Sequence, residues 1–185
     1  MQGSVVEHVQ ALDRIGVRSI EVRKKEQLDE IDGLILPGGE STTLGKLLHL
    51  FGIKEPLKER IQKGMPVFGT CAGLILLANR IEGEAPHIGV MDICVRRNAY
   101  GRQIDSFSKK CTIAEFSPKP MELVFIRAPW IEKAYGSARV LAELDGHIIA
   151  ARQDNMLVTS FHPELTQENF VHTYFADMTV RSKQP

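Results

Sequence analysis

A chain of 185 residues is long enough to bury a full hydrophobic core, and we expect residues 1–185 to form a single domain. Hydrophobic residues make up 43% and charged residues 25%, and the formal net charge is zero, which argues against nucleic acid or a membrane surface as the main partner. The sequence has three widely spaced cysteines, no apolar run long enough to span a membrane and no N-terminal leader. We therefore expect a cytoplasmic protein without disulfides or a bound metal.

The first half of the chain alternates predicted helices and strands. Apolar residues recur at three- and four-residue spacing from Val5 to Ile15, which predicts a helix ending at Gly16, with His8 partly solvated on it. Further elements follow with short connections: a strand over 17–22, a strand over 34–36, a helix that follows the break over 37–43 and runs to about Phe51, a helix over 56–62 and a strand over 67–68. This alternation predicts an α/β fold with a doubly wound, parallel sheet.

Strands dominate the second half of the chain. Apolar or alternating segments predict strands over 88–95, 110–113, 123–127, 140–144, 147–152 and 156–161. Asp145-Gly146 predicts a two-residue hairpin, so the sheet is expected to gain antiparallel strands here. Residues 98–107 are polar and are expected to form a loop or hairpin arm over the cleft. The apolar spacing after Phe170 predicts a C-terminal helix.

The stretch Gly69-Thr70-Cys71-Ala72-Gly73 joins an apolar strand to a helical segment. This is the pattern of a nucleophile elbow, with cysteine where α/β-hydrolases have serine. The tight turn requires small residues two positions before and after the nucleophile, and the amide dipoles of the following helix favour the thiolate of Cys71. On this pentapeptide alone, a buried cysteine in a βα turn is an equally good interpretation.

A cysteine nucleophile needs a base and a group that orients the base. His162-Pro163-Glu164 follows the apolar strand over 156–161, and the carboxyl ends of strands are where the sites of α/β sheets gather. In extended chain, residues i and i+2 project to the same side, so Glu164 can accept a hydrogen bond from one nitrogen of His162 while the other faces Cys71. A solvated loop histidine beside a surface glutamate is the alternative interpretation of this triplet.

Acyl transfer also needs backbone N–H groups that bind the developing oxyanion. Gly38-Gly39 lies between a predicted strand and a predicted helix and can approach a substrate closely. Ala72 directly follows the nucleophile, so the amides of Gly39 and Ala72 are the candidate donors. The structural alternative is a simple turn in which Ser41 or Thr42 caps the next helix.

Together, residues 37–41, 69–73 and 161–164 resemble the triad class of glutamine amidotransferases. More narrowly, the sequence is similar over nearly its whole length to the glutaminase subunits of pyridoxal 5′-phosphate synthase. The segments that carry this narrower resemblance are residues 38–43, 97–103, 106–107, 125–129 and 162–166. The resemblance implies a three-layer, flavodoxin-like α/β fold with a mostly parallel central sheet, helices on both faces and antiparallel additions in the second half.

The resemblance also implies a reaction and a partner. Cys71 would attack the side-chain amide of L-glutamine, His162, oriented by Glu164, would protonate the leaving ammonia, and water would hydrolyse the γ-glutamyl thioester. No cofactor is implied. The positions that match the glutamine-binding residues of the family are Gly38, Gly39, Glu40, Ser41, Arg97, Ile126 and Arg127. In the family, ammonia passes to a barrel-shaped synthase subunit in a large hetero-oligomer, and docking of that subunit completes the oxyanion hole.

Two features depart from the family pattern. Family members usually begin with an apolar strand before a Leu-Gln-Gly-like turn, whereas this sequence begins at that turn. If the polypeptide lacks that strand, a central position of the sheet is expected to be empty. Arg96 stands where the family commonly has glutamate, which reverses a charge beside the predicted glutamine site.

Three other functions stay open at this point. One is a glutaminase that serves another biosynthetic partner, although the loop over 98–107 argues against it. Another is a cysteine peptidase or hydrolase on a similar sheet, which the turn over 37–41 and the motif at His162 disfavour. The third is a catalytically impaired interaction subunit, which would result if the missing strand disrupts the fold.

Overall fold

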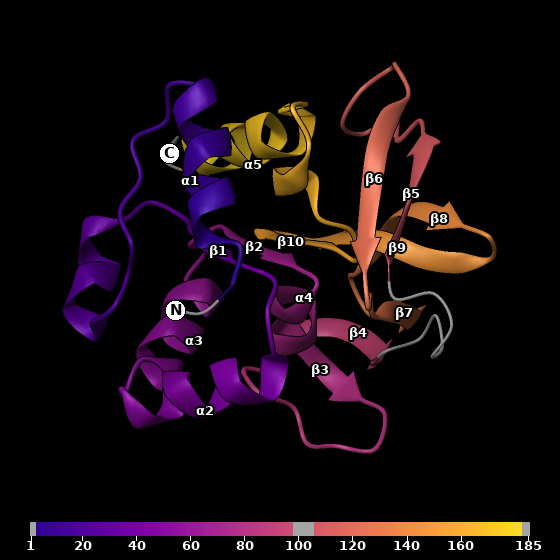
Figure 1. Ribbon diagram of the computed structural model, residues 1–185. Helices are drawn as coiled ribbons and strands as arrows, with labels where there is room; N and C mark the ends of the chain where they lie inside the picture. Colours follow the sequence, from indigo (N-terminus) through magenta and orange to yellow (C-terminus); the bar gives the residue numbers. More distant parts are fainter. Residues whose placement is uncertain (1–2, 98–105, 183–185) are drawn as a thin grey trace.

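A mixed β-sheet with helices on both faces forms the centre of the computed structural model, which describes residues 3–97 and 106–182 (Figure 1). The N-terminal and C-terminal helices cover one face, and three helices of the first half cover the other (Figure 1). The elements in chain order are α1 (Val5–Arg14), η1 (Lys25–Glu30), β1 (Leu34–Leu36), α2 (Ser41–Leu50), α3 (Lys54–Gln62), β2 (Val67–Thr70), α4 (Ala72–Leu77), β3 (Ala78–Ile81), β4 (Met91–Arg96), β5 (Ser106–Cys111), β6 (Met121–Ile126), β7 (Trp130–Ala134), β8 (Arg139–Leu144), β9 (His147–Gln153), β10 (Met156–Thr159), η2 (Pro163–Leu165) and α5 (Phe170–Arg181).

The strands of the main sheet lie in the order β1-β2-β10-β9-β7-β4-β3, and β8 pairs with β9 outside this path. β1, β2 and β10 are parallel neighbours, as are β3 and β4. The pairs that involve β7, β8 and β9 are antiparallel, and β5 and β6 form a separate antiparallel pair. The predicted α/β fold, with antiparallel strands added by the second half of the chain, is confirmed.

Neighbouring residues of the central strands point to opposite faces and build two hydrophobic cores. Val67 of β2 and Val158 of β10 belong to the core beneath α2, α3 and α4. Phe68 and Leu157 belong to the core that α5 and the β5–β6 pair cover. All four residues are fully buried, which explains why both strands are apolar at successive positions rather than alternating.

The strand expected over residues 17–22 is not formed, and the prediction is wrong at this point. Residues 17–23 have no regular secondary structure, and within the described chain no backbone acceptor pairs with the amides of residues 18–22. A strand needs a neighbouring strand to satisfy its amides. An alternating pattern without such a neighbour therefore leaves an irregular segment.

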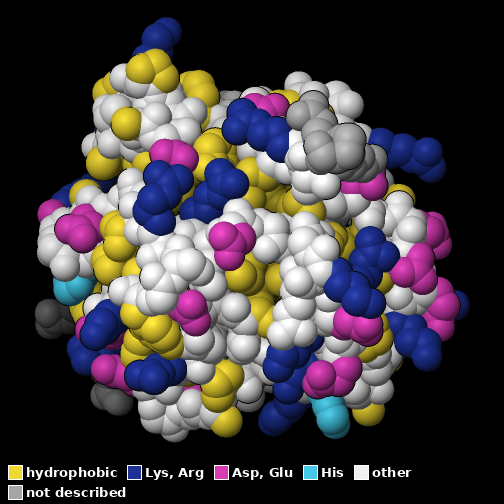
Figure 2. Space-filling model, turned by 180° about the vertical axis from the view of Figure 1, so that it is seen from behind, with side chains coloured by type: hydrophobic (Ala, Val, Ile, Leu, Met, Phe, Trp, Pro, Cys, Tyr) yellow, Lys and Arg dark blue, Asp and Glu magenta, His cyan; other side chains and the backbone are white. Residues whose placement is uncertain are grey.

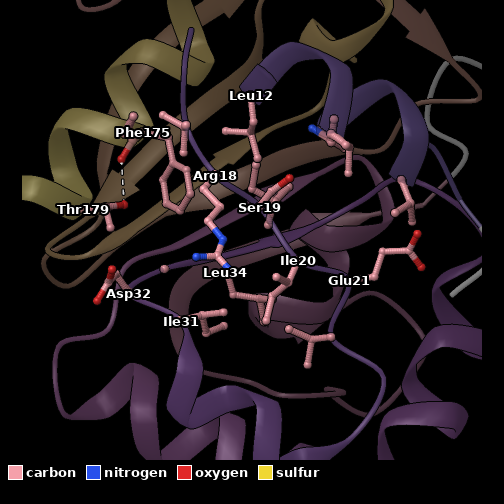
Figure 3. Close-up of a pocket in the computed structure, with 18 of the residues that line it drawn as sticks. Leu12, Arg18, Ser19, Ile20, Glu21, Ile31, Asp32, Leu34, Phe175 and Thr179 are labelled. Carbon is pink, nitrogen blue, oxygen red and sulfur yellow. Dashed lines mark hydrogen bonds between the residues drawn. The ribbon is translucent and has the colours of Figure 1, made fainter. Parts of the chain in front are cut away.

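A cavity of about 650 Å³ separates this segment from β1 (Figure 3). Its walls are mainly apolar and come from α1, β1, α5 and the irregular segment, with Leu12, Ile20, Leu34 and Phe175 among the lining residues (Figure 3). β1 pairs with β2 on its other side and has no second strand partner among the described residues. The cavity therefore lies along the edge of β1 that faces away from β2.

Several element boundaries also differ from those expected. The sequence does not predict β3, which begins directly after the short helix α4 ends at Leu77. The sequence does not predict β7 either, which pairs with both β4 and β9. β5 begins at Ser106, inside the segment expected to be a loop or hairpin arm, and residues 98–105 of that segment lie outside the described residues.

The hairpin and the helices are confirmed more closely. Leu144 of β8 lies opposite His147 of β9, and Asp145 and Gly146 between them have φ angles of 52° and 80°. Positive φ at both turn residues is the geometry that an Asp-Gly hairpin favours. The helices expected up to about Phe51, over 56–62 and after Phe170 correspond to α2, α3 and α5.

The unpaired segment leads to a prediction about local stability. We expect the backbone amides of residues 18–22 to exchange with solvent at least about a hundredfold faster than those of β2, because they can exchange without opening the sheet. Native-state hydrogen exchange followed by mass spectrometry or NMR measures this difference. Equal protection of the two segments would contradict the described arrangement.

Candidate active site

The carboxyl ends of three adjacent parallel strands carry the predicted chemistry. Gly38 lies in the turn after β1, Cys71 directly follows β2, and His162 lies shortly after β10. A Cβ atom built on Gly38 would lie 2.5 Å from Cε1 of His162 and 3.6 Å from Cβ of Cys71. The pairing of β1 with β2 and of β2 with β10 thus brings together residues that are far apart in the sequence.

Cys71 lies at a strained turn between β2 and α4. Its φ of 49° and ψ of −99° are uncommon for a residue with a side chain, and the residue is only 7% exposed. A Cβ atom on Gly69 would overlap the backbone of Gly73, and one on Gly73 would overlap the carbonyl oxygen of Leu36. The turn therefore has the strain and the small flanking residues that a nucleophile elbow requires.

His162 and Glu164 form a buried pair. Nδ1 of His162 lies 2.8 Å from Oε1 of Glu164, and the two side chains are 8% and 0% exposed. The backbone amide of His162 donates to the carbonyl oxygen of Val124 at 2.8 Å, which ties the histidine to β6. Because an ionised carboxylate only accepts hydrogen bonds, Nδ1 of His162 carries a proton.

Electrostatic interactions keep this pair ionised. Burial by itself lowers the pKa of His162, but its interactions with Cys71 and Glu164 outweigh burial and raise the pKa to about 10. Burial by itself raises the pKa of Glu164, but the hydrogen bond from His162 and the interaction with His8 outweigh burial and lower the pKa to about 2. At neutral pH, Glu164 is therefore a carboxylate that orients the ring of His162 and favours its protonated form.

Two backbone amides are the candidates for an oxyanion hole. Ala72 is the first residue of α4, where an amide has no acceptor within the helix. Gly39 lies in the turn after β1 at a φ of 146°, which favours glycine over residues with a side chain. Both amides come from segments that flank Cys71, since Ala72 follows it directly and the turn at Gly38 contacts it.

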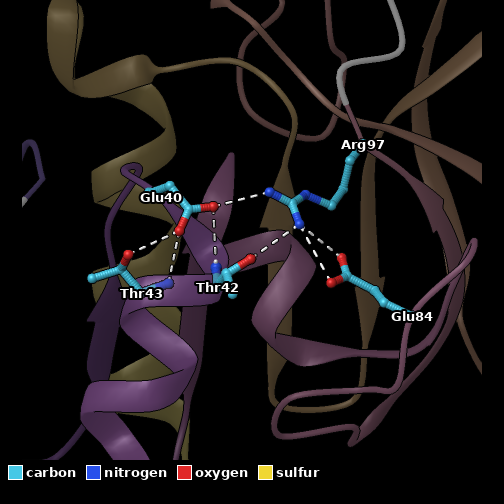
Figure 4. Close-up of polar contacts among 5 residues, drawn as sticks. All are labelled: Glu40, Thr42, Thr43, Glu84 and Arg97. Atoms are coloured by element: carbon cyan, nitrogen blue, oxygen red, sulfur yellow. Dashed lines mark hydrogen bonds and ion pairs between the residues drawn. The ribbon is translucent and has the colours of Figure 1, made fainter.

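Two residues predicted to bind glutamine, Glu40 and Arg97, contact each other (Figure 4). Nη2 of Arg97 lies 2.9 Å from Oε1 of Glu40, and Nη1 lies 3.1 Å from Oε1 of Glu84. Nη1 of Arg97 also donates to Oγ1 of Thr42 at 3.1 Å. Hydrogen bonds from the amide and the hydroxyl of Thr43, together with the charge of Arg97, lower the pKa of Glu40 to about 2. This cluster places a cation and an anion side by side near the elbow.

The residue that caps the start of α2 is not the one expected if residues 37–42 were a simple turn. The N-cap is Glu40, whose carboxylate accepts from the amides of Thr42 and Thr43, so a cap at Ser41 or Thr42 is wrong. Ser41 is the first residue of the helix, and its buried hydroxyl has no hydrogen-bond partner within the described part of the chain. A buried hydroxyl without a partner is uncommon, and a bound substrate is one way to satisfy it.

The end of β6 contributes the other two predicted substrate residues. The carbonyl oxygen of Ile126 lies 4.0 Å from Sγ of Cys71. Arg127 follows directly, is exposed, and has a φ of 42°, which is uncommon for a residue with a long side chain. Strained backbone of this kind is frequent at functional sites, and here it directly follows the residue that contacts the sulfur.

The charge of Arg96 is balanced locally. Nε of Arg96 lies 2.7 Å from Oε2 of Glu82 and 2.8 Å from Oε1 of Glu132, and Nη2 donates to Oε1 of Glu82 at 3.0 Å. The reversed charge relative to the family pattern is therefore compensated by two carboxylates. The cluster around Arg97 does not depend on Arg96.

Among the described residues, the surface has no strongly charged patch of one sign on the face shown in Figure 2. On the face shown in Figure 2, Lys and Arg side chains are interspersed with Asp and Glu side chains rather than gathered by sign. Among residues 3–97 and 106–182, no group of His, Cys, Asp or Glu has the arrangement of a metal site. No helix in those ranges is both long and apolar enough to cross a membrane.

Three neighbours of the site are not predicted from the sequence. Glu84 holds Arg97 from the segment after β3, and Ser4 donates a hydrogen bond to Glu164. His8 lies 3.5 Å from Glu164 and is only 4% exposed, so the expectation of a partly solvated side chain is wrong. A signal existed for His8, because its position three residues after Val5 and four before Leu12 places it on the apolar face of α1.

In this α/β protein, Cys71, the His162–Glu164 pair and the turn at Gly38 lie together at adjacent strand ends. The sequence profile of the SNO glutamine amidotransferase family matches residues 1–181. The chain therefore belongs to the SNO glutamine amidotransferase family.

Curated relatives and a solved structure agree with this assignment. A protein of Carboxydothermus hydrogenoformans named pyridoxal 5′-phosphate synthase subunit PdxT is 56% identical over 178 residues, which cover 96% of this chain and 93% of the relative. A protein of the same name from Clostridium beijerinckii is 53% identical over 175 residues, covering 94% and 92%. A crystal structure described as a glutamine amidotransferase is 43% identical with a TM-score of 0.91, covering 97% of this chain and 95% of that one.

The lowered pKa of Glu164 leads to a prediction about stability and pH. The stabilisation from ionised Glu164 is fully present above the ordinary carboxyl pKa of 4.5 and is lost as the pH falls toward about 2. We expect Glu164→Gln to lower the free energy of unfolding by about 2 kcal/mol at pH 7, and we expect this difference to shrink as the pH falls from about 5 to 3. Urea unfolding at each pH measures it.

Glu59→Gln is the matched control for this experiment. Glu59 pairs with Lys63 on the surface, where both side chains are mostly exposed, so its replacement should change the free energy of unfolding little at any pH. A Glu164→Gln difference that stays constant from pH 7 to pH 3 would contradict the ionised pair.

Proposed function

We propose that the chain hydrolyses L-glutamine to L-glutamate and ammonia with Cys71 as nucleophile, His162 as general acid and base, and Glu164 as the group that orients His162. The observation that carries this proposal is the buried His162–Glu164 pair beside Cys71 at adjacent strand ends. A cysteine at a strained turn beside a histidine oriented by a carboxylate is the arrangement that nucleophilic catalysis needs.

In the first half of the proposed reaction, the Cys71 thiolate attacks the carbon of the side-chain amide. The carbonyl oxygen becomes an oxyanion, and the amides of Gly39 and Ala72 donate hydrogen bonds to it. Protonated His162 then gives its Nε2 proton to the amide nitrogen as the carbon–nitrogen bond breaks. Ammonia leaves, and a γ-glutamyl thioester remains on Cys71.

In the second half, water replaces the thiolate. Nε2 of His162 has lost its proton to ammonia and accepts one from the attacking water. The hydroxide attacks the thioester carbon, the same oxyanion forms, and the carbon–sulfur bond breaks to release glutamate and the thiolate. The carboxylate of Glu164 holds the Nδ1 proton throughout, so the ring keeps its orientation in both halves.

The substrate is held through the residues at the ends of β1, β4 and β6. Glutamine carries an α-ammonium and an α-carboxylate, which need an anion and a cation in fixed positions. The adjacent charges of Glu40 and Arg97 supply this combination. The further positions proposed to contact the substrate are Gly38, Gly39, Ser41, Ile126 and Arg127.

The names of the relatives support a partner subunit, because both curated relatives are named as subunits of pyridoxal 5′-phosphate synthase. The family resemblance implies that the ammonia passes to another subunit of that enzyme. We propose that this chain delivers ammonia to a barrel-shaped synthase subunit within a large hetero-oligomer, in the cytoplasm, for the synthesis of pyridoxal 5′-phosphate. Docking of that subunit is expected to complete the oxyanion turn at Gly39.

The nucleophile assignment is tested by Cys71→Ala. We expect glutamate release, measured with and without the cognate synthase subunit, to fall below about a thousandth of the wild-type rate because no thioester can form. Assembly with the synthase, measured by size-exclusion chromatography, should persist. Cys94→Ala is the matched control and should keep its activity. A folded wild-type chain that is inactive in both conditions, or an active Cys71→Ala variant, would exclude the proposed mechanism.

The role of Arg97 is tested by its effect on KM. We expect Arg97→Ala to raise the KM for glutamine about tenfold or more with a smaller change in kcat, because a cation that binds the α-carboxylate acts in the ground state as well as the transition state. Arg96→Ala, next in sequence but engaged with Glu82 and Glu132, serves as the control. Equal KM values for the two variants would show that Arg97 does not bind the substrate.

A further inference from the structure

Two buried histidines outside the proposed triad form a chain that ends at Glu164. Nε2 of His172, on α5, lies 3.0 Å from Nδ1 of His8, on α1. Nε2 of His8 lies 3.5 Å from Oε1 of Glu164 and 3.2 Å from Oγ1 of Thr70, the residue before the nucleophile. His8 and His172 are 4% and 0% exposed. A side chain of α5 thus contacts one of α1, and the latter lies beside the carboxylate of Glu164.

The carboxylate of Glu164 decides the tautomers of the two rings. It is ionised and would repel an imidazole lone pair, so Nε2 of His8, 3.5 Å from it, carries the proton, and the hydrogen-bond partner of this nitrogen is Oγ1 of Thr70 at 3.2 Å. Burial lowers the pKa of His8 below its ordinary value, so the ring is neutral and its Nδ1 is an acceptor. Nε2 of His172 must then carry the proton that lies between the two rings.

The far end of the chain agrees with this assignment. Burial lowers the pKa of His172 to about 3, so this ring is also neutral and has a single N–H. With that N–H on Nε2, the remaining nitrogen, Nδ1, is an acceptor, and it has no partner among the described residues. A buried acceptor without a partner is tolerated better than a buried donor without one.

Packing alone does not account for these residues. The surroundings of both rings are apolar, with Phe68 stacking edge-on against each of them at centroid distances of 6.2 and 6.1 Å. Apolar side chains of similar size would fill this space without the cost of burying polar rings. The polar side chains that His8 contacts besides His172 are Glu164 and Thr70. Glu164 is hydrogen-bonded to the proposed base, His162, and Thr70 directly precedes the proposed nucleophile, Cys71.

We propose that His8 and His172 are positioning residues of the glutaminase reaction: His172 fixes the tautomer of His8, and His8 fixes the carboxylate of Glu164 so that it holds His162 in line with Cys71. This inference rests on the proposed function, since it concerns the same triad. Ser4 donates a second hydrogen bond to the same carboxylate oxygen, so the carboxylate is held from two sides besides His162.

The test is a double-mutant cycle between His8 and Glu164 in the complete enzyme with its synthase subunit. We expect His8→Leu to lower kcat about tenfold or more while the KM for glutamine changes less than about twofold. His8→Gln, whose Nε2 can donate from a similar place, should recover most of the loss. In a Glu164→Ala background, His8→Leu should cause no further loss, because the carboxylate through which it acts is absent.

A control and a second measurement separate this inference from the proposed function. Phe175→Leu changes the same buried cluster on α5 without touching the polar chain, and it should lower the stability but not kcat. The Nδ1 proton of His162 should give a far-downfield NMR signal in the resting protein, and His8→Leu and His172→Leu should shift it. This NMR measurement does not depend on catalytic activity, so it tests the inference separately from the proposed function.

The outcomes are distinct. Loss of stability with unchanged kcat and an unshifted His162 signal in the His8 and His172 variants would overturn the inference and leave the triad intact. An equal loss of kcat in the wild-type and Glu164→Ala backgrounds would also overturn it. Activity that survives Cys71→Ala would instead contradict the proposed function, whatever the His8 variants show.

Discussion

The start of α4 passes so close to β1 that a side chain at Gly73 would overlap the carbonyl oxygen of Leu36. This contact sets where the helix begins, and it leaves Cys71 at a φ of 49° between a buried strand and a buried helix. The nucleophile is therefore held by the backbone rather than by its own side-chain contacts. The turn at Gly38 and the ring of His162 can contact it only because their strands lie next to β2 in a parallel register.

The interior of the site is ionic, although its surroundings are hydrophobic. Buried charges are costly unless they are paired and hydrogen-bonded, and Oε1 of Glu164 meets this condition through His162 and Ser4, whereas Oε2 has no partner among the described residues. The pairing lowers the pKa of Glu164, and together with the contact to Cys71 it raises the pKa of His162. At the start of α2, Arg97 is held between Glu40 and Glu84 (Figure 4).

The sequence predicts the parts of this site that are encoded locally. The elbow at Cys71 and the His162–Glu164 pair lie in short segments, and strand ends gather in α/β sheets, so their meeting could be expected. The pairing of Arg97 with Glu84 depends on a contact between separate elements, which a single sequence does not reveal. The burial of His8 follows the apolar face of α1, but its contact with Glu164 again joins distant segments. The strand expected over 17–22 fails for the same reason, since alternation indicates a strand but not whether a partner lies beside it.

The central claim is that glutamine is hydrolysed through a thioester on Cys71. Its most direct test is to mix the chain and its synthase subunit with L-glutamine and to quench the reaction with acid during turnover. The protein is then digested, and the mass of the peptide that contains Cys71 is measured by mass spectrometry. The account predicts that this peptide gains the mass of one glutamyl group, and that the gain disappears after the glutamine is exhausted. Turnover without any adduct, or an adduct on another residue, would contradict it.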